Sequence, residues 1–392
     1  MANERKLLVF DDDEEIRQMI TLLASKEGFE VTPVGTLAEF REAVDQVRPD
    51  AIIQDLSLTD CDGIEVLRSL GAQGCKAAIV VISSFDEKLL RSALSLGRDF
   101  GLNMIGNLRK PITGKGLREV LSKVPETSQM VREDDLGKAI AGRDLFLTYQ
   151  PKVDMATGEV RSAEALVRWR DPHRGMIFPD QFISLAEQSG LIEPMTDLIL
   201  AMAIREAASW KAKGWDIAVA VNLSAATLVD LDFPTKVTTL LAEYGVKANQ
   251  LILEVTETTA MSDARKTLDI LTRLRIKGIA ISLDDFGTGY SSLVELHRMP
   301  FSELKIDRSF VIGIVEEPDA RIITSAILGL GSALGLKVVA EGVETAEHWQ
   351  FLKDNNCNLA QGYFLTRPLP SEDFANWVEN WNNGRELELG LG

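Results

Sequence analysis

Short apolar runs alternate with stretches of helical periodicity along the whole chain, and this alternation limits the possible folds more than any other feature. In the first 124 residues, the runs KLLVF (6–10), AIIQD (51–55) and AIVVIS (78–83) are typical of buried strands. An apolar stripe with helical spacing follows the first run. Strands that alternate with helices favour a parallel sheet with helices on both faces. Residues 1–124 are therefore predicted to form a doubly wound α/β domain.

The second half of the chain repeats the alternation for much longer. Eight strands over about 240 residues is the length of a barrel of strands and helices, with an open doubly wound sheet as the alternative. The polar, proline-containing stretch 124–135 interrupts the pattern, so residues 125–135 are predicted to be a linker or the start of a connecting helix. A second domain is predicted over 136–385. The eight candidate strands are 146–153, 162–169, 217–224, 251–257, 279–285, 303–307, 337–344 and 359–364.

Composition excludes several classes of protein. The 42 Lys and Arg residues are outnumbered by 59 Asp and Glu, and the net charge of -17 repels phosphate backbones, so DNA binding is not expected. Three scattered cysteines and three scattered histidines argue against a disulfide framework and against a histidine-built zinc site. A signal peptide and a membrane-length apolar run are both missing, so we expect a cytoplasmic protein without membrane insertion.

Acidic and hydroxyl side chains follow the strands predicted in the first half. Asp11 and Asp12 follow the first strand, Asp55 and Ser83 end two others, and Lys110 follows a later apolar stretch. The carboxyl ends of parallel strands meet in one crevice, and carboxylates gathered there repel one another unless a hard cation such as Mg2+ lies between them. Taken singly, each acid could instead begin a helix.

With this ordered set of residues, the first half resembles the receiver domain of two-component response regulators, which has a flavodoxin-like fold. The resemblance implies phosphorylation of Asp55 by a sensor histidine kinase. It also implies that Mg2+ is held by Asp11, Asp12 and Asp55, and that Ser83 and Lys110 contact the phosphoryl group.

Polar residues also occur at the strand ends of the second half. Their ligand atoms are almost all oxygens, which favours Mg2+ or Mn2+. The adjacent Asp284 and Asp285 could serve two ions, the arrangement that stabilises an in-line phosphoryl displacement. They cannot both point inward from a regular strand, so the chain is expected to turn there, helped by Gly287 and Gly289. The polar residues at these strand ends are Glu164, Asn222, Glu254, Asp284, Asp285, Lys305, Asp307, Glu341 and Gln361.

Structural explanations remain open for single members of this set. Glu164 could be a strand residue paired with Arg168, Asn222 could be a helix cap, and the loop at 284–289 could be a plain turn. These explanations account badly for the pattern of polar residues over all the strand ends.

The second half is similar to the EAL family of cyclic di-GMP phosphodiesterases over roughly residues 135–380. The motifs that carry the resemblance are YQP (149–151), EALVRW (164–169), NLS (222–224), LEVTE (253–257), DDFGTGYSSL (284–293), KIDRSF (305–310), EGVE (341–344) and QGY (361–363). The resemblance implies a TIM-like (β/α)8 barrel with one antiparallel strand. It also implies hydrolysis of cyclic di-GMP to linear pGpG with two Mg2+ or Mn2+ ions, and a homodimer or higher oligomer.

The resemblance also implies a role for each matching residue. Glu164, Asn222, Glu254 and Asp284 would hold the first ion, and Asp284 and Asp285 the second, near Glu341. Lys305 would position the attacking water, with support from Asp307, and Glu341 is a candidate general base. Gln150, Arg168 and Gln361 would hold the substrate, and Glu257 would anchor the loop after Asp285. The alternatives are a catalytically silent receptor for cyclic di-GMP and, less favoured, a DNA-binding regulator. We also expect phosphorylation of the first domain to regulate the second.

Overall fold

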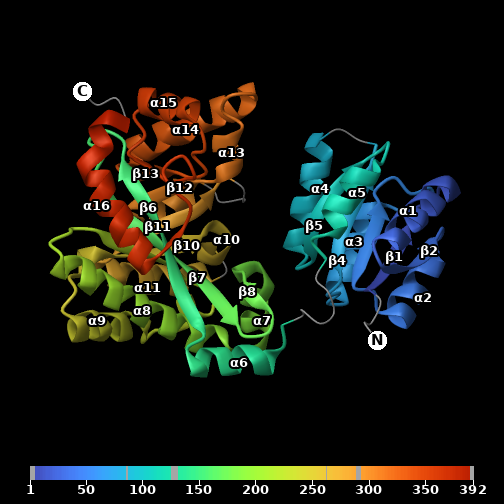
Figure 1. The fold of residues 1–392 in the computed structure, drawn as a ribbon, viewed down its shortest axis with the longest axis horizontal. Coiled ribbons are helices and arrows are strands. Elements are labelled where there is room, and N and C mark those ends of the chain that lie inside the picture. The colour runs from blue at the N-terminus through green and yellow to red at the C-terminus, as the bar shows by residue number, and fades with distance from the viewer. Residues whose placement is uncertain (1–4, 85–86, 125–130, 262, 288–292, 389–392) are drawn as a thin grey trace. The chain divides into compact units, whose positions relative to one another are not determined.

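The computed structural model describes residues 5–84, 87–124, 131–261, 263–287 and 293–388. The chain divides into two compact units, residues 1–130 and 131–392 (Figure 1). Residues 125–130 of the predicted linker lie outside the described residues. Helix α6 (Glu133–Gly142) begins inside the last part of the segment predicted as linker.

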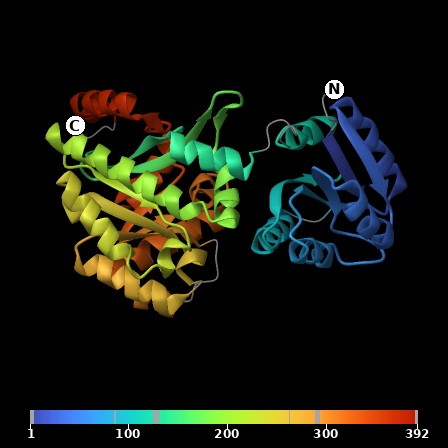
Figure 2. The ribbon, with the colours of Figure 1, turned by 90° about the horizontal axis from the view of Figure 1, so that it is seen from below.

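In its described residues, the first unit is a five-stranded parallel sheet in the order β2-β1-β3-β4-β5. Alternate residues of β1 enter two separate cores. Leu7 and Val9 pack with α1 and α5, whereas Leu8 and Phe10 pack with α2, α3 and α4. The predicted doubly wound fold is therefore confirmed, and Figure 2 shows helices on both sides of the sheet. The elements are β1 (Arg5–Phe10), α1 (Glu14–Lys26), β2 (Phe29–Val34), α2 (Leu37–Val47), β3 (Ala51–Asp55), α3 (Gly63–Ala72), β4 (Ala78–Ser83), α4 (Glu87–Asp99), β5 (Asn103–Arg109) and α5 (Gly114–Leu121).

Two strands of the first unit, β2 and β5, were not among the predicted strands. Both lie at the edges of the sheet. Their sequences, FEVTPV and NMIGNLR, are mixed in polarity and only partly buried, and they contain Pro or Gly. Edge strands tolerate such residues, so the continuous apolar run that marks a central parallel strand is missing.

In the described residues of the second unit, eight strands close into a barrel. Strand β6 pairs antiparallel with both β7 and β14, and the other neighbours around the barrel are parallel. The predicted barrel with one antiparallel strand is confirmed, and the open sheet is excluded. The short strands β8 (Gly175–Ile177) and β15 (Leu369–Pro370) extend the pairing. The barrel strands are β6 (Leu145–Asp154), β7 (Val160–Asp171), β9 (Ala218–Asn222), β10 (Leu251–Thr256), β11 (Ala280–Phe286), β12 (Glu303–Ile306), β13 (Lys337–Ala340) and β14 (Leu359–Ala360).

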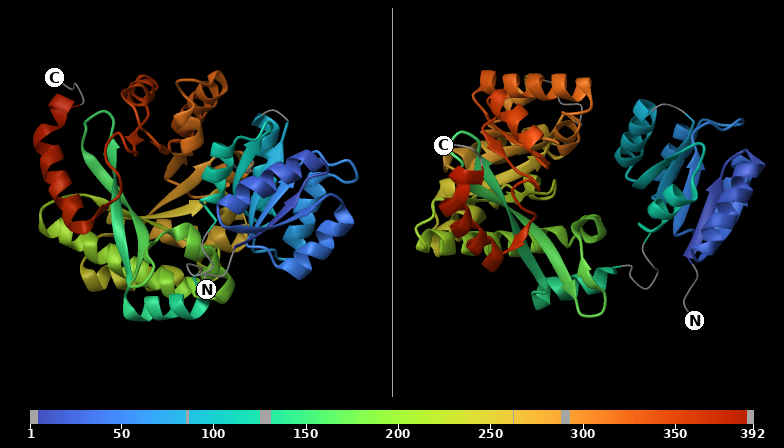
Figure 3. Two further views of the ribbon diagram at one scale, coloured as in Figure 1. Left: turned by 45° about the vertical axis from the view of Figure 1, so that its right-hand side comes forward. Right: turned by 45° about the horizontal axis from the view of Figure 1, so that its top comes forward.

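The helices of the second unit surround these strands (Figure 3). Their apolar faces pack on outward strand residues such as Leu253 and Val255, while the alternate residue, Glu254, points into the barrel. No helix in the described parts of the chain is both long and apolar enough to cross a membrane. The helices after α6 are α7 (Pro179–Ser189), α8 (Ile192–Ala212), α9 (Phe233–Tyr244), α10 (Glu257–Met261), α11 (Ala264–Ile276), α12 (Leu293–Arg298), α13 (Arg308–Ile312), α14 (Pro318–Leu334), α15 (Ala346–Asp354) and α16 (Ser371–Glu388).

Two strand predictions in the barrel were too long by four residues each. The run 337–344 leaves the sheet after Ala340, and the run 359–364 leaves it after Ala360. The glycines just beyond explain both ends. Gly342 has a φ of +70°, and a Cβ on Gly362 would lie 2.1 Å from the carbonyl oxygen of Val343. The two segments cross closely there instead of pairing as strands.

Candidate functional site

The carboxylates predicted to act together in the first unit are brought together at the carboxyl edge of its sheet. One oxygen from each of Asp11, Asp12 and Asp55 lies within 4.8 Å of the others. The Lys110 Nζ is 2.5 Å from Asp55 Oδ2 and 3.0 Å from Asp11 Oδ2. The Lys110 backbone N–H donates to the carbonyl oxygen of Ser83 at 3.0 Å, so the predicted hydroxyl residue lies beside the same cluster.

The alternative that these acids begin helices applies to their neighbour Asp13. Its carboxylate caps α1 by accepting from the backbone N–H groups of Glu15 and Ile16. Burial raises the pKa of Asp11. Burial acts to lower the pKa of Lys110, but its hydrogen bonds to Asp55 and Asp11 raise that pKa overall. The cluster therefore combines two buried acids, Asp11 and Asp55, with one charged ammonium.

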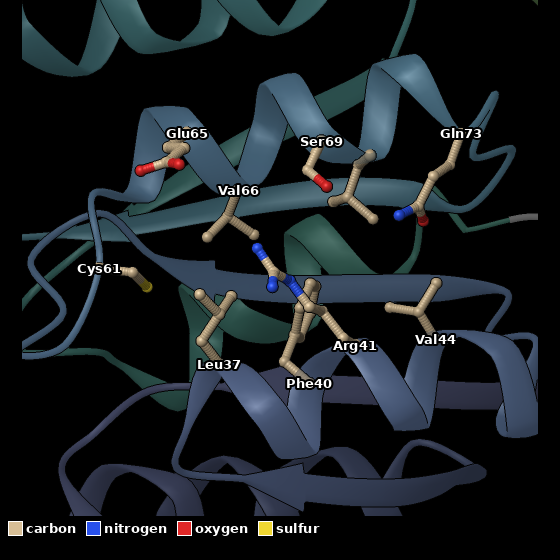
Figure 4. Close-up of a pocket in the computed structure, with 10 residues that line it drawn as sticks. Leu37, Phe40, Arg41, Val44, Cys61, Glu65, Val66, Ser69 and Gln73 are labelled. Carbon is tan, nitrogen blue, oxygen red and sulfur yellow. The ribbon is translucent and has the colours of Figure 1, made fainter.

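A separate pocket of the first unit lies between α2 and α3 (Figure 4). Its volume of about 20 Å³ has room for little more than one water molecule. Leu37, Phe40 and Val44 on α2 face Val66 on α3 across it. This pocket is a packing gap between helices and does not compete with the acidic cluster as a ligand site.

In the second unit, Lys305 lies at the centre of the predicted acidic basin. It projects inward from β12 because its neighbours Leu304 and Ile306 belong to the outer core. The ammonium is buried, and the Lys305 pKa is raised well above its usual value: burial opposes this rise, but the surrounding carboxylates outweigh it. The four carboxylates and their distances from the Nζ are Glu341 at 2.7 Å, Asp284 at 2.9 Å, Glu254 at 3.0 Å and Glu164 at 3.7 Å.

Asp284 and Asp285 both face this basin because the strand is distorted between them. The register of β11 against β12 shifts between Leu283 and Phe286, and Asp285 adopts a left-handed φ of +54°. The predicted turn therefore begins at Asp285 itself and continues at Gly287, whose φ is +100°. Gly289 and the rest of loop 288–292 lie outside the described residues.

The carboxylates of Asp284, Asp285 and Glu341 lie close enough to share a cation, with one oxygen of each within 4.8 Å of the others. Burial, and then the charge of Asp284, raises the pKa of Asp285 to about 6. Burial also raises the pKa of Glu341 to about 8, although Lys305 opposes this. Four carboxylates lie within 3.7 Å of the single ammonium of Lys305, so the donor set fits a hard divalent cation.

Hydrogen bonds fix Glu164 from two sides. Asn222 Nδ2 donates to its Oε1 at 2.9 Å, and Gln361 Nε2 donates to its Oε2 at 2.6 Å. Gln361 also donates to Gln150 Oε1 at 3.0 Å. Asn222 therefore orients Glu164 and does not act as a simple helix cap. The guanidinium of Arg168 donates to the Val167 carbonyl oxygen, and the ion pair described for Glu164 is with Lys305.

A cavity of about 180 Å³ opens above these groups. Its lining includes Gln150, Glu164, Asp284, Lys305, Glu341 and Gln361. Three other predicted residues lie elsewhere around the mouth. The Asp307 carboxylate caps α13 through the backbone N–H of Ser309 at 2.9 Å, Arg168 is half-buried on β7, and Glu257 is buried at the start of α10. The contact predicted between Glu257 and the loop after Asp285 involves residues outside the described part.

Sequence reasoning missed two charged residues inside the barrel. Lys152 on β6 is fully buried, with its Nζ 2.5 Å from Glu254 Oε1 and 3.3 Å from Glu303 Oε1. Burial opposes but does not prevent the lowering of the Glu254 pKa, because Lys152 and Lys305 both lie against this carboxylate. For Lys152, the available signal was a lone lysine within a run predicted to be a strand.

Comparison with known proteins follows the same division of the chain. Residues 133–368 match the family described as EAL domain, and residues 7–122 match the family described as response regulator receiver domain. A Pseudomonas aeruginosa protein named cyclic di-GMP phosphodiesterase RocR is 30% identical over 391 residues, which cover 96% of this chain and 99% of that protein.

Other similar proteins match mainly the second unit. The P. aeruginosa bifunctional diguanylate cyclase/cyclic di-GMP phosphodiesterase MucR is 46% identical over 61% of this chain and 35% of that protein. The chain spans about a third of the length of this and the next two curated relatives. A solved structure described as PaMucR phosphodiesterase in complex with c-di-GMP superposes with a TM-score of 0.60 at 46% identity. The superposition covers 62% of this chain and 98% of the chain in the solved structure. The chain therefore belongs to the EAL domain family, with a response regulator receiver domain preceding its EAL domain.

Proposed function

We propose that this chain hydrolyses cyclic di-GMP to linear pGpG and that its receiver domain regulates this activity. The observation that carries the proposal is the basin in which Lys305 lies within 3.7 Å of four carboxylates, below an open cavity lined by Gln150 and Gln361. Similar proteins named cyclic di-GMP phosphodiesterases include one that matches almost the whole chain. These observations support a phosphodiesterase.

The donor set suits Mg2+ or Mn2+. Glu164, Asn222, Glu254 and Asp284 would hold one ion, and Asp284 and Asp285, near Glu341, would hold another. When bound, such ions would offset the charge of the phosphodiester and lower the pKa of a water. The geometry supports this assignment, since one carboxylate oxygen from each of Asp284, Asp285 and Glu341 lies within 4.8 Å of the others.

Residues of the chain itself would stabilise the charge of the reacting phosphate and accept the proton of the attacking water. Lys305 provides a fixed positive charge beside the reacting phosphate and its water. Glu341, whose Oε1 lies 2.7 Å from the Lys305 Nζ, is the candidate to accept the proton of that water. The water oxygen bonds to phosphorus as the bond from phosphorus to the 3′-oxygen breaks, which opens the ring.

Substrate contacts would come from Gln150, Arg168 and Gln361, around the rim of the basin. Gln361 already connects Gln150 with Glu164 through two hydrogen bonds. Any movement of Gln361 on substrate binding would therefore alter its hydrogen bond to Glu164, a carboxylate of the basin. Asp307, at the cap of α13, and Glu257, at the start of α10, would hold the neighbouring segments in place.

The receiver domain would accept a phosphoryl group on Asp55 from a sensor histidine kinase. Asp11 and Asp12 would hold Mg2+ with Asp55, and Lys110 and Ser83 would contact the phosphoryl oxygens. The approach of Lys110 to both Asp55 and Asp11 supports this assignment. We infer that phosphorylation changes the turnover of cyclic di-GMP by the second domain.

The test is turnover of cyclic di-GMP by the purified full chain in Mg2+, followed by chromatography. We expect linear pGpG from the unmodified chain, none after chelation of Mg2+, and none from Glu164→Ala. Glu243→Ala, which changes an exposed glutamate of α9, is the matched control and should retain turnover. Tight binding of cyclic di-GMP without any product from the unmodified chain would instead identify a silent receptor.

A further inference from the structure

We infer that Lys152 is a positioning residue that holds Glu254 in the orientation needed to bind a divalent cation. This inference deepens the proposed function and rests on its assignment of Glu254 as a metal ligand. Lys152 itself lies outside the set of groups that face the open cavity.

The contacts of Glu254 are divided between its two oxygens. Oε1 accepts from Lys152 at 2.5 Å, and Oε2 accepts from Lys305 at 3.0 Å. Lys152 approaches from inside the barrel, and Lys305 lies in the basin among the other carboxylates. Lys152 therefore fixes Oε1 from inside the barrel, which leaves Oε2 directed toward the basin.

The position of Lys152 is itself fixed by a second carboxylate. Its Nζ lies 3.3 Å from Glu303 Oε1, and Glu303 also borders a cavity at the opposite end of the barrel. Lys152, Glu254 and Glu303 are all almost completely buried. A barrel interior is normally filled by branched apolar side chains, so a buried row of Glu303, Lys152 and Glu254 needs a reason beyond packing.

The chemistry of metal sites supplies that reason. Groups that orient a ligand from behind are needed for tight binding, and their loss typically weakens metal affinity by about 10- to 100-fold. A simple charge effect would act in the opposite direction, because removing a nearby ammonium favours a cation. The two roles of Lys152 therefore give opposite signs in one measurement.

Mn2+ binding to the full chain, measured by electron paramagnetic resonance of free Mn2+, provides that measurement. All proteins would carry Asp11→Asn and Asp12→Asn, so that the receiver cluster does not contribute. We expect Lys152→Met and the double variant Lys152→Met/Glu303→Leu to bind Mn2+ about 10- to 100-fold more weakly. Lys152→Gln, whose amide can still donate to Glu254, should recover most of the affinity. Glu303→Gln, whose amide oxygen can still accept from Lys152 and so leaves the Lys152–Glu254 contact in place, should bind nearly as the parent does.

The double variant avoids an unpaired buried carboxylate, and tryptophan emission reports whether each barrel is folded. In folded variants, turnover lost at micromolar Mn2+ should return at millimolar Mn2+, a rescue that a purely structural role would not give. Unchanged or tighter Mn2+ binding by the folded double variant would overturn the inference. So would loss of native emission in both the double variant and Lys152→Gln, since Lys152 would then serve folding. If the unmodified chain binds Mn2+ but leaves cyclic di-GMP intact, the proposed function fails while the Mn2+ comparison still decides the role of Lys152.

Discussion

Replacement of Lys305 by methionine would test how much of the barrel's stability depends on one buried charge. The substitution keeps the chain length and removes the ammonium from among four carboxylates at 2.7–3.7 Å. Removing one partner of a buried ion pair typically costs about 3–5 kcal/mol, because the remaining charges are left uncompensated. With an m-value of about 3 kcal/mol per molar urea, the unfolding midpoint should fall by roughly 1 to 1.7 M.

The assay is urea unfolding of the full chain followed by tryptophan fluorescence. The signal reports only on the second unit, because all six tryptophans lie there, at positions 169, 210, 215, 349, 377 and 381. Lys337→Met, which changes an exposed lysine of the neighbouring strand β13, is the matched control and should leave the midpoint unchanged. Saturating Mg2+ should narrow the gap between Lys305→Met and the parent, because the variant has lost an ammonium that repels the ion and so gains more stability from Mg2+ binding to its folded state.

The loss of stability in Lys305→Met relative to the parent should also depend on pH. The pKa values of Asp285 and Glu341 are raised to about 6 and about 8, so each group binds a proton more readily in the folded chain than in the unfolded chain. Stability linked to such groups is present at low pH and is lost as pH rises. Loss of Lys305 enlarges this effect, so the deficit should grow between about pH 5 and pH 8. A Lys305→Met midpoint equal to that of Lys337→Met at pH 8 would refute the reasoning.

Two further substitutions test the two units separately. Asp55→Asn should abolish labelling of the chain by acetyl phosphate, measured by phosphate-affinity electrophoresis. The control Asp45→Asn, on the exposed side of α2, should label normally. Labelling that survives in Asp55→Asn would place the phosphoryl group elsewhere. Gly362→Ala puts a Cβ 2.1 Å from the carbonyl oxygen of Val343, so it must displace the segment that carries Gln361. Turnover of cyclic di-GMP should therefore fall about 100-fold. Gly329→Ala, where nothing lies within 4 Å, should retain turnover, and equal rates for the two alanine variants would contradict the close approach seen in the structure.

The sequence predicted the architecture of both units because parallel strands leave a strong signal. Buried runs such as AIVVIS and LILEVT have apolar residues on both faces, and these became the central strands β4 and β10. The edge strands β2 and β5 lack that signal. The early ends of β13 and β14 depend on the close crossing of Gly362 with Val343, a tertiary contact that no local pattern contains.

The candidate site shows the same division. Residues at strand ends, such as Glu164, Asp284 and Lys305, could be found because position along a strand predicts which mouth of the barrel they reach. Lys152 could not be placed in this way, because it lies within its strand and its role depends on Glu254 and Glu303, more than a hundred residues away. The turn at Asp285 was expected from the paired aspartates, but its left-handed conformation required the structure.

The most direct test of the central claim is mass spectrometry of the product formed from cyclic di-GMP in water enriched in oxygen-18. The full chain would be incubated with Mg2+ and the nucleotide, and the products separated by chromatography. We expect linear pGpG that carries one oxygen-18 in its phosphate, because hydrolysis transfers one oxygen from water to phosphorus. Recovery of intact, unlabelled cyclic di-GMP from a folded chain that binds it would contradict the claim and show that the acidic basin binds the nucleotide without cutting it.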